Sequence, residues 1–130
     1  MSDATPRGDG RLISSFRYAG AGILYVLRSQ RNFRIHLLIT ILIVLVGLWV
    51  QLVWVEWAII ALTVAMVLLA EMFNTVAETA IDMATNHYHP LAKIAKDVAA
   101  GAVLIMAIMA VIIGLLVLGP HLLERLLPLA

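Results

Sequence analysis

The chain has 130 residues, of which 63% are hydrophobic and 13% are charged, and its mean hydropathy is +1.02. A soluble domain of this size cannot hide so much apolar side chain from water, so the composition excludes an ordinary soluble enzyme, a disordered tail and a nucleic-acid-binding module. The net charge of +1 supplies no basic field for nucleic acid, and the absence of cysteine excludes disulfides, thiolate catalysis and cysteine-based metal sites.

The chain opens on residues 1–10, which are small and polar and are predicted to form a flexible tail. Residues 12–33 follow as a predicted surface helix. At about 100° per residue their large apolar side chains fall on one broad arc, which Arg17 and Arg28 flank. Such a helix lies in the membrane interface with its arginines at anionic head groups, and a plain membrane anchor would show the same pattern.

Three predicted spans come next, over about residues 35–55, 57–82 and 90–118. The first and third have the roughly 20 apolar residues that a bilayer crossing requires. The second span is apolar only as far as Ala70, and Glu71 then opens a polar segment that protein must shelter from lipid. The sequence therefore predicts an all-α membrane protein with one domain over residues 11–130.

Charge predicts how these spans are oriented. Arginines cluster before the first span, and Lys93 and Lys96 lie in the second loop, whereas the first loop carries only Glu56. By the positive-inside rule the amino terminus and the second loop are cytoplasmic. Three tryptophans then fall at the outer interface, where they suit an aromatic belt: Trp49, Trp54 and Trp57.

The most informative segment is EMFNTVAETAID, residues 71–82. Its polar residues are spaced i, i+3, i+7 and i+11, which places them on one helix stripe about 80° wide: Glu71, Asn74, Glu78 and Asp82. Three carboxylates on one stripe repel each other unless cations, protons or a metal ion compensate them. A solvated helix end is the simpler interpretation. Glu71, however, follows an unbroken apolar run, and ionisable groups inside membranes usually serve function.

A second polar element, Lys93-Ile-Ala-Lys96-Asp97, lies where the third helix enters the membrane, on the same side as the acidic stripe. A lysine that extends toward the interface beside a carboxylate partner would account for it alone. Together with the acidic stripe it predicts a site where carboxylates hold Mg²⁺, Mg²⁺ bridges phosphate oxygens and a lysine neutralises the remaining charge. The sequence has no glycine-rich nucleotide motif. His36, at the start of the first span, is interpreted as an interfacial histidine and not as a ligand.

Three stretches resemble the integral-membrane prokaryotic diacylglycerol kinase and undecaprenol kinase family: RNFRIH, EMFNTVAETAID and HYHPLAKIAKDVAAGAVL. The resemblance covers roughly residues 11–118. It implies three spans with an amino-terminal surface helix, a bacterial inner-membrane location, and a homotrimer with active sites between neighbouring subunits. It also implies ATP as co-substrate, Mg²⁺ as cofactor and a membrane lipid alcohol as acceptor.

The resemblance assigns roles to individual residues. It implies that Glu71 is the catalytic base, that Glu78 is the Mg²⁺ ligand facing ATP, and that Asn74 orients the reacting groups. Gln30 stands where the family has a second metal-binding glutamate, so it offers a carbonyl ligand without negative charge. Asp82 is a further carboxylate that could compensate for that loss. The remaining expected contacts are Tyr18, His87, His89, Lys96 and Asp97 for the nucleotide, and Arg11 and Trp49 for the lipid.

These observations predict a lipid kinase in which Glu71 removes the proton of the lipid hydroxyl while Mg²⁺ and Lys96 neutralise charge on the γ-phosphoryl group. The RNFRIH and HPLAKIAKD stretches favour undecaprenol over diacylglycerol as acceptor. Two other classes fit part of the pattern. One is a small transporter that uses Glu71 or Glu78 as a proton-coupled cation site, and the other is a structural assembly subunit.

Overall fold

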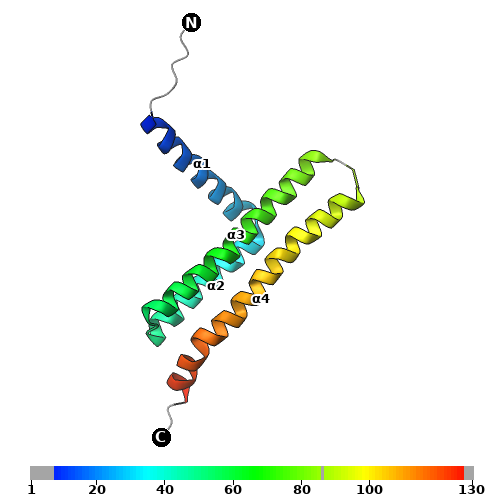
Figure 1. The fold of residues 1–130 in the computed structure, drawn as a ribbon. Helices are drawn as coiled ribbons and strands as arrows, with labels where there is room; N and C mark the ends of the chain where they lie inside the picture. Colours follow the sequence, from blue (N-terminus) through cyan, green and yellow to red (C-terminus); the bar gives the residue numbers. More distant parts are fainter. Residues whose placement is uncertain (1–7, 86, 128–130) are drawn as a thin grey trace.

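The structure, a computed structural model, describes residues 8–85 and 87–127. This part of the chain consists of four helices without strands: α1 (Gly8–Ser29), α2 (Arg31–Val50), α3 (Trp54–Ala84) and α4 (Pro90–Leu126). Helices α2, α3 and α4 form a bundle, and α1 leaves it at an angle (Figure 1). The three bundle helices are long and apolar enough to cross a membrane, which confirms the predicted all-α membrane fold with an additional amino-terminal helix.

The first helix has other bounds than those predicted. Helix α1 begins at Gly8, so residues 8–10 are helical and not a flexible tail, while residues 1–7 lie outside the described part of the chain. The predicted surface helix over 12–33 is divided at Gln30, whose extended backbone (φ −101°, ψ 116°) starts a new direction. The Gln30 N–H still donates to the Val26 carbonyl (2.8 Å) and closes the last turn of α1. The arginines after Gln30 therefore belong to the first span.

The turn between α2 and α3 ends the first span at Val50 and not at 55. Gln51 adopts a left-handed conformation (φ 61°, ψ 52°). This lets the Leu52 N–H donate to the Gly47 carbonyl at 3.1 Å, the usual way in which a left-handed residue terminates a helix. Glu56 then accepts a hydrogen bond from the Val53 N–H at 2.9 Å and caps the start of α3. Local hydrogen bonding, which apolar periodicity does not reveal, sets these bounds.

Gly47 is required by the close packing of this turn. A Cβ built at Gly47 would lie 2.8 Å from Cη2 of Trp57 and 3.0 Å from Cδ1 of Leu52. The Trp57 indole thus packs against the turn in addition to its expected place in an aromatic belt, whereas Trp54 is 90% exposed.

We expect Gly47→Ala to lower the free energy of unfolding by about 1–3 kcal/mol, because the extra methyl group must displace the indole or the helix backbone. Thermal unfolding of the detergent-solubilised protein measures this loss. Gly20→Ala in α1 is the matched control, since its Cβ meets nothing within 4 Å and alanine favours the helix. Equal melting temperatures for the two variants would contradict the packing account.

Helix α4 begins at Pro90, as predicted, and the side chain of His89 accepts the Leu91 N–H at 3.2 Å (Nδ1···N) to cap it. The helix does not stop at 118 but passes through Pro120 to Leu126. A contact between His121 and Glu56, 3.4 Å from Nε2 to Oε2, ties these extra turns to the start of α3. Asn86, in the predicted α3–α4 loop, lies outside the described residues.

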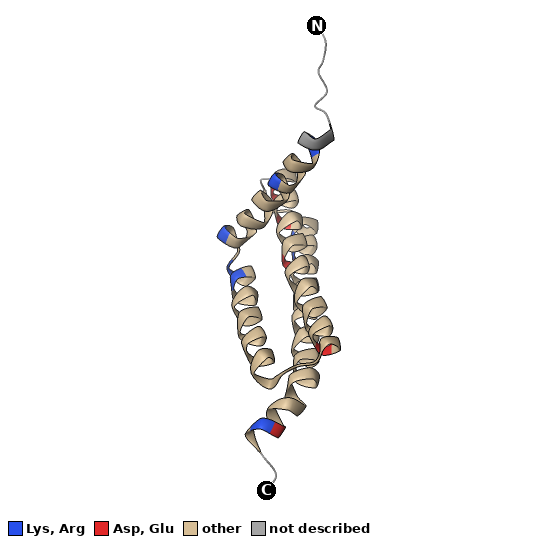
Figure 2. Cartoon of the chain, turned by 90° about the vertical axis from the view of Figure 1, so that its left-hand side faces the viewer, with Lys and Arg blue, Asp and Glu red and all other residues tan. Residues whose placement is uncertain are grey.

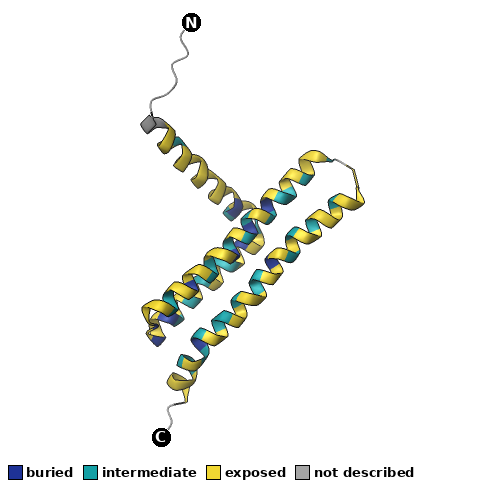
Figure 3. Cartoon of the chain, viewed as in Figure 1, coloured by how far each residue is buried: buried dark blue, intermediate teal, exposed yellow. Residues whose placement is uncertain are grey.

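Burial is sparse and follows the inner faces of the bundle (Figure 3). Large apolar side chains such as Leu45, Ile105 and Leu116 are exposed, as expected for a surface that faces lipid. An apolar cluster around Val50 and Ile60 closes the end of the bundle at the α2–α3 turn. Among the described residues the buried polar ones are Glu71 and Thr75, and both lie in the other half of α3.

Candidate active site

The polar stripe of α3 begins near the edge of the hydrocarbon layer. At ~1.5 Å per residue, Glu71 lies about 26 Å along the helix from Trp54, and Asp82 lies about 42 Å from it. A bilayer has a hydrocarbon core about 30 Å thick, so with Trp54 at one interface the stripe rises from the opposite edge into the head groups. Basic residues gather on α1 and at the start of α2, at this same end (Figure 2).

A cavity of about 300 Å³ lies between α2, α3 and α4, and we call it the polar cavity. Its polar lining comes from two helices: Asn32 and His36 of α2, and Glu71, Asn74 and Glu78 of α3. Helix α4 contributes a wall of small and apolar side chains: Ala100, Val103, Leu104 and Ala107. The stripe residues predicted from helical spacing therefore do face one cavity as far as Glu78.

Glu71 is the most buried of these residues, with 2% of its surface exposed. The Nε2 atom of His36 lies 3.3 Å from its Oε1 atom, but the two groups are not aligned as a hydrogen bond, and Oε1 has no hydrogen-bond partner. An unsatisfied buried polar group costs about 1–3 kcal/mol, more if charged. This burial rules out the solvated helix end for Glu71 and leaves a carboxylate oxygen able to accept a ligand's hydroxyl.

Asn74 and Glu78 form the part of the predicted site that lies nearer to the α3–α4 loop. Asn74 Nδ2 donates to Glu78 Oε1 at 3.1 Å, and this leaves the buried Oδ1 atom of Asn74 without a partner. Carboxylate and amide oxygens suit Mg²⁺. Within residues 8–85 and 87–127 no three histidine, aspartate or glutamate side chains gather into a metal cage. The donor set fits a Mg²⁺ ion that arrives on phosphates and takes one or two protein oxygens.

A second hollow of about 470 Å³, the loop cavity, lies where α3, the following loop and α4 meet. Its lining includes four of the five residues expected to contact nucleotide, together with the carboxylate of Asp82: His87, His89, Lys96 and Asp97. Lys96 Nζ pairs with Asp82 Oδ1 across the two helices at 2.5 Å, while Asp97 pairs with Lys93. The simpler interpretation, a lysine beside its own carboxylate neighbour, does not describe Lys96 and Asp97, because side chains four residues apart, not adjacent ones, meet on a helix.

Four of the predicted residues join neither cavity within one chain. Gln30 sits at the break between α1 and α2 and does not line the polar cavity. Arg11 and Tyr18 are exposed on α1, where the Arg17 guanidinium lies 5.5 Å from the Tyr18 ring centre. Trp49 is exposed near the far end of α2, roughly 20 Å along the helix from His36.

Two cavity residues were not predicted as ligands, namely Asn32 and His36. His36 had been interpreted as an interfacial histidine, yet the structure places it against Glu71. Asn32 and His36 are four residues apart and share one face of α2 at the start of an otherwise apolar span. This spacing indicates a polar face on α2, but only the packing of α2 against α3 shows that the face lines the same cavity as Glu71.

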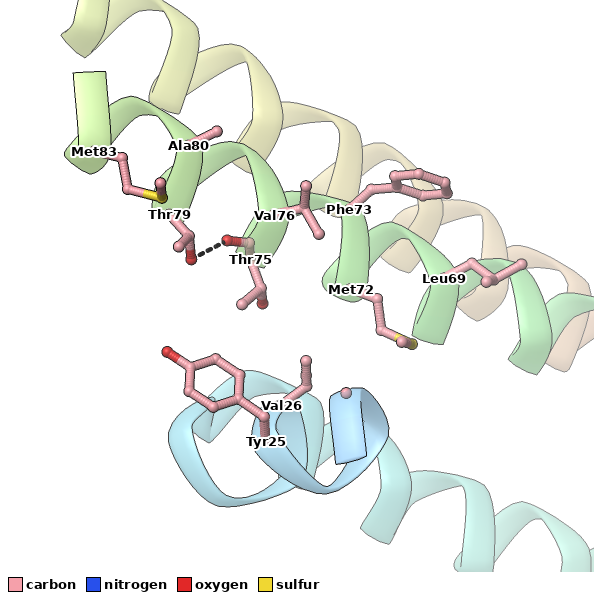
Figure 4. A pocket seen from close by; sticks show the side chains of 11 residues that line it. Tyr25, Val26, Leu69, Met72, Phe73, Thr75, Val76, Thr79, Ala80 and Met83 are labelled. Carbon is pink, nitrogen blue, oxygen red and sulfur yellow. Dashed lines mark hydrogen bonds between the residues drawn. The ribbon is translucent and has the colours of Figure 1, made fainter. Parts of the chain in front are cut away.

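Apolar hollows flank the site. One of about 470 Å³ separates α1 from α3, and its lining of Tyr25, Val26 and Met72 with neighbouring side chains is drawn in Figure 4. It shares no lining residue with the polar cavity. A groove of about 370 Å³ between α2 and α4 does share His36 and Ala107 with that cavity. The apolar groove therefore adjoins the polar cavity at His36 and Ala107.

Comparison with known proteins connects this geometry to a family. The family model described as prokaryotic diacylglycerol kinase matches residues 17–118, which include every residue of the polar cavity and the loop cavity. The chain belongs to this family. The transmembrane bundle and the polar stripe of α3 are thus features of a prokaryotic diacylglycerol kinase family member.

Individual relatives carry two different names. A diacylglycerol kinase from Synechocystis is 46% identical over 114 residues, 87% of this chain and 65% of the relative, so the chain spans just under two thirds of that protein. An undecaprenol kinase from Bacillus subtilis is 42% identical over 112 residues, 86% of this chain and 91% of the relative. A diacylglycerol kinase from Escherichia coli is 28% identical over 114 residues, 88% of this chain and 93% of the relative.

Proposed function

We propose that this protein is an ATP- and Mg²⁺-dependent lipid kinase that phosphorylates the hydroxyl group of a membrane lipid alcohol, undecaprenol in preference to diacylglycerol. One observation carries the proposal. Glu71 is a buried carboxylate whose Oε1 atom has no hydrogen-bond partner, and it lines a polar cavity near the membrane edge in a chain of this family. Because the acceptor cannot leave the bilayer, its hydroxyl must meet the nucleotide at such a depth.

Glu71 acts as the general base in the proposed reaction. The acceptor hydroxyl donates a hydrogen bond to the carboxylate, and Glu71 takes the proton as the hydroxyl oxygen bonds to the γ-phosphorus. The bond from that phosphorus to the bridging oxygen of ATP breaks, and ADP leaves with the electron pair. Base catalysis of this kind contributes about 10²–10⁴-fold to a rate, and positioning and electrostatics supply most of the remainder.

The other stripe residues hold the phosphates in this proposal. Glu78 and the free oxygen of Asn74 would hold Mg²⁺, which when bound supplies positive charge to the phosphoryl oxygens. Lys96, which lines the loop cavity, would neutralise the remaining phosphate charge. The loop cavity begins at Asp82, which is one helical turn beyond Glu78 on α3. His87, His89 and Asp97 line the same cavity and are assigned to the nucleotide.

The chain is proposed to work as a homotrimer in the bacterial inner membrane, with its amino terminus and active sites on the cytoplasmic side. The polar cavity is at the small end of the range for ligand sites, so one chain offers little room for a nucleotide together with a lipid. Tyr18 and Gln30, which join no cavity of their own chain, would complete the site of a neighbouring subunit, and Arg11 and Trp49 would contact the lipid.

Side-by-side turnover on two acceptors tests the proposed function. Purified protein in mixed micelles receives γ-labelled ATP, Mg²⁺ and either undecaprenol or diacylglycerol at the same mole fraction. We expect label in the extracted lipid, with the higher kcat/KM for undecaprenol. Label in neither lipid would contradict the proposal. A transporter would instead show a flux into vesicles that depends on Glu71 or Glu78 and needs no ATP.

Gln30 provides a test of the metal assignment. We expect Gln30→Glu to lower the Mg²⁺ concentration at half-maximal activity several-fold, because it adds a negative oxygen ligand where glutamine offers a neutral one. A Mg²⁺ titration of lipid phosphorylation at fixed ATP measures the shift. Gln30→Asn, which keeps an amide at this position, is the control for substitution alone. An unchanged Mg²⁺ dependence in Gln30→Glu would remove Gln30 from the metal site.

A further inference from the structure

His36 reaches the buried carboxylate from a different helix. It stands in the second turn of α2, with 20% of its side chain exposed, and its Nε2 atom lies 3.3 Å from Oε1 of Glu71 on α3. Elsewhere on α3, Thr75 donates only to the backbone carbonyl of Glu71, at 3.0 Å. In the described part of the chain, His36 is therefore the polar side chain in contact with the Glu71 carboxylate.

Contact with His36 can fix the direction in which the Glu71 carboxylate points. A glutamate side chain has three rotatable bonds, so a buried one needs a neighbour to select the rotamer that the reaction uses. A carboxylate oxygen offers two lone pairs, so Oε1 can receive one N–H from His36 and still accept a hydroxyl from the polar cavity. Catalytic hydrogen bonds are often poorly aligned before the substrate binds, as the His36–Glu71 contact is here.

The position of His36 at three cavities also supports a role in orienting Glu71. It lines the polar cavity, the apolar groove between α2 and α4, and a small apolar hollow deeper between the three spans. It thus stands where apolar surroundings give way to polar ones, at the point where the hydroxyl end of a lipid would approach Glu71.

We propose that His36 is the positioning residue of the active site, which holds the Glu71 carboxylate so that Oε1 stays turned toward the acceptor hydroxyl. The proposal rests on the proposed kinase function and names a residue that acts through Glu71. It does not assign proton transfer to His36 itself.

Packing and positioning can be separated at this site. Buried apolar side chains lie near His36, namely Phe33 on α2 and Val67 on α3. The variants of His36 must therefore distinguish a loss of packing from a loss of positioning. His36→Gln keeps an N–H donor, His36→Leu fills the space without one, and His36→Ala leaves space for added imidazole. The chain also offers a matched control, His121→Leu, which removes the second histidine–glutamate contact at the opposite end of the bundle.

We expect His36→Leu to lower kcat for lipid phosphorylation about 10- to 100-fold with little change in KM for ATP, since a misplaced catalytic group costs up to about 10²-fold. His36→Gln should retain most of the activity. Imidazole should restore part of the kcat of His36→Ala but none of that of His36→Leu. His121→Leu should match the unsubstituted protein.

Three results would overturn the inference. The first is full activity in His36→Leu. The second is an equal loss in all three His36 variants that imidazole does not reverse, because that pattern indicates packing alone. The third is a rise in KM for ATP with kcat preserved, which would place His36 on the nucleotide. Absence of labelled lipid in the unsubstituted protein would instead refute the kinase function, so the two failures are distinguishable.

Discussion

Glu71→Gln is expected to abolish almost all lipid phosphorylation, with a loss of about 10²–10⁴-fold in kcat. The amide has nearly the shape of the carboxylate but cannot take the acceptor proton. Because Glu71 is buried at the polar cavity and its Oε1 atom makes no hydrogen bond, the substitution breaks no hydrogen bond of that atom, and the amide oxygen can keep the contact with His36. The variant should bind nucleotide and elute from a sizing column as the unsubstituted protein does.

Glu56→Gln is the matched control for this prediction. Glu56 lies on the same helix, at its opposite end, and accepts one backbone N–H that a glutamine oxygen can also accept. We expect it to keep full turnover. Initial rates of label transfer from γ-labelled ATP measure both variants. Activity in Glu71→Gln above a few per cent would show that another group removes the proton.

Lys96→Met should produce the second largest loss, about 10²–10³-fold in kcat/KM for ATP, the range found when one preorganised group that stabilises developing charge is removed. Lys96 now pairs with Asp82, but both side chains are partly exposed, at 39% and 66%. Such exposed pairs contribute only about 0–1 kcal/mol, so exchanging the aspartate for phosphate costs little. The methionine keeps the length of the side chain and removes its charge.

Arg125→Met is the control for the loss of a positive charge on α4. Arg125 lies in the last turn of that helix, at the end opposite the loop cavity. Its rate should equal that of the unsubstituted protein. If Lys96→Met and Arg125→Met have the same kcat/KM, Lys96 does not contact the nucleotide.

Much of the candidate site could be predicted from the sequence because it depends on one helix. The spacing of Glu71, Asn74 and Glu78 fixes their common face on α3 wherever that helix packs, and the structure shows all three lining one cavity. The three spans follow equally from the length and the apolar character of local segments.

What the sequence could not show depends on packing between helices. His36 and Asn32 reach the polar cavity only because α2 lies against α3, and Lys96 meets Asp82 across two helices rather than its neighbour Asp97. The break at Gln30 and the left-handed turn at Gln51 likewise depend on backbone hydrogen bonds that hydropathy does not reveal. The roles assigned to Arg11, Tyr18 and Trp49 stay predictions drawn from family resemblance.

An experimental structure of the protein in lipid nanodiscs, with Mg²⁺ and a non-hydrolysable ATP analogue, tests the central claim most directly. The account predicts the γ-phosphate beside Glu78 and Lys96, the metal ion on Glu78, and the free oxygen of Glu71 directed toward the bilayer side of that phosphate. A nucleotide bound away from both Glu78 and Lys96, with the polar cavity empty in every subunit, would contradict it.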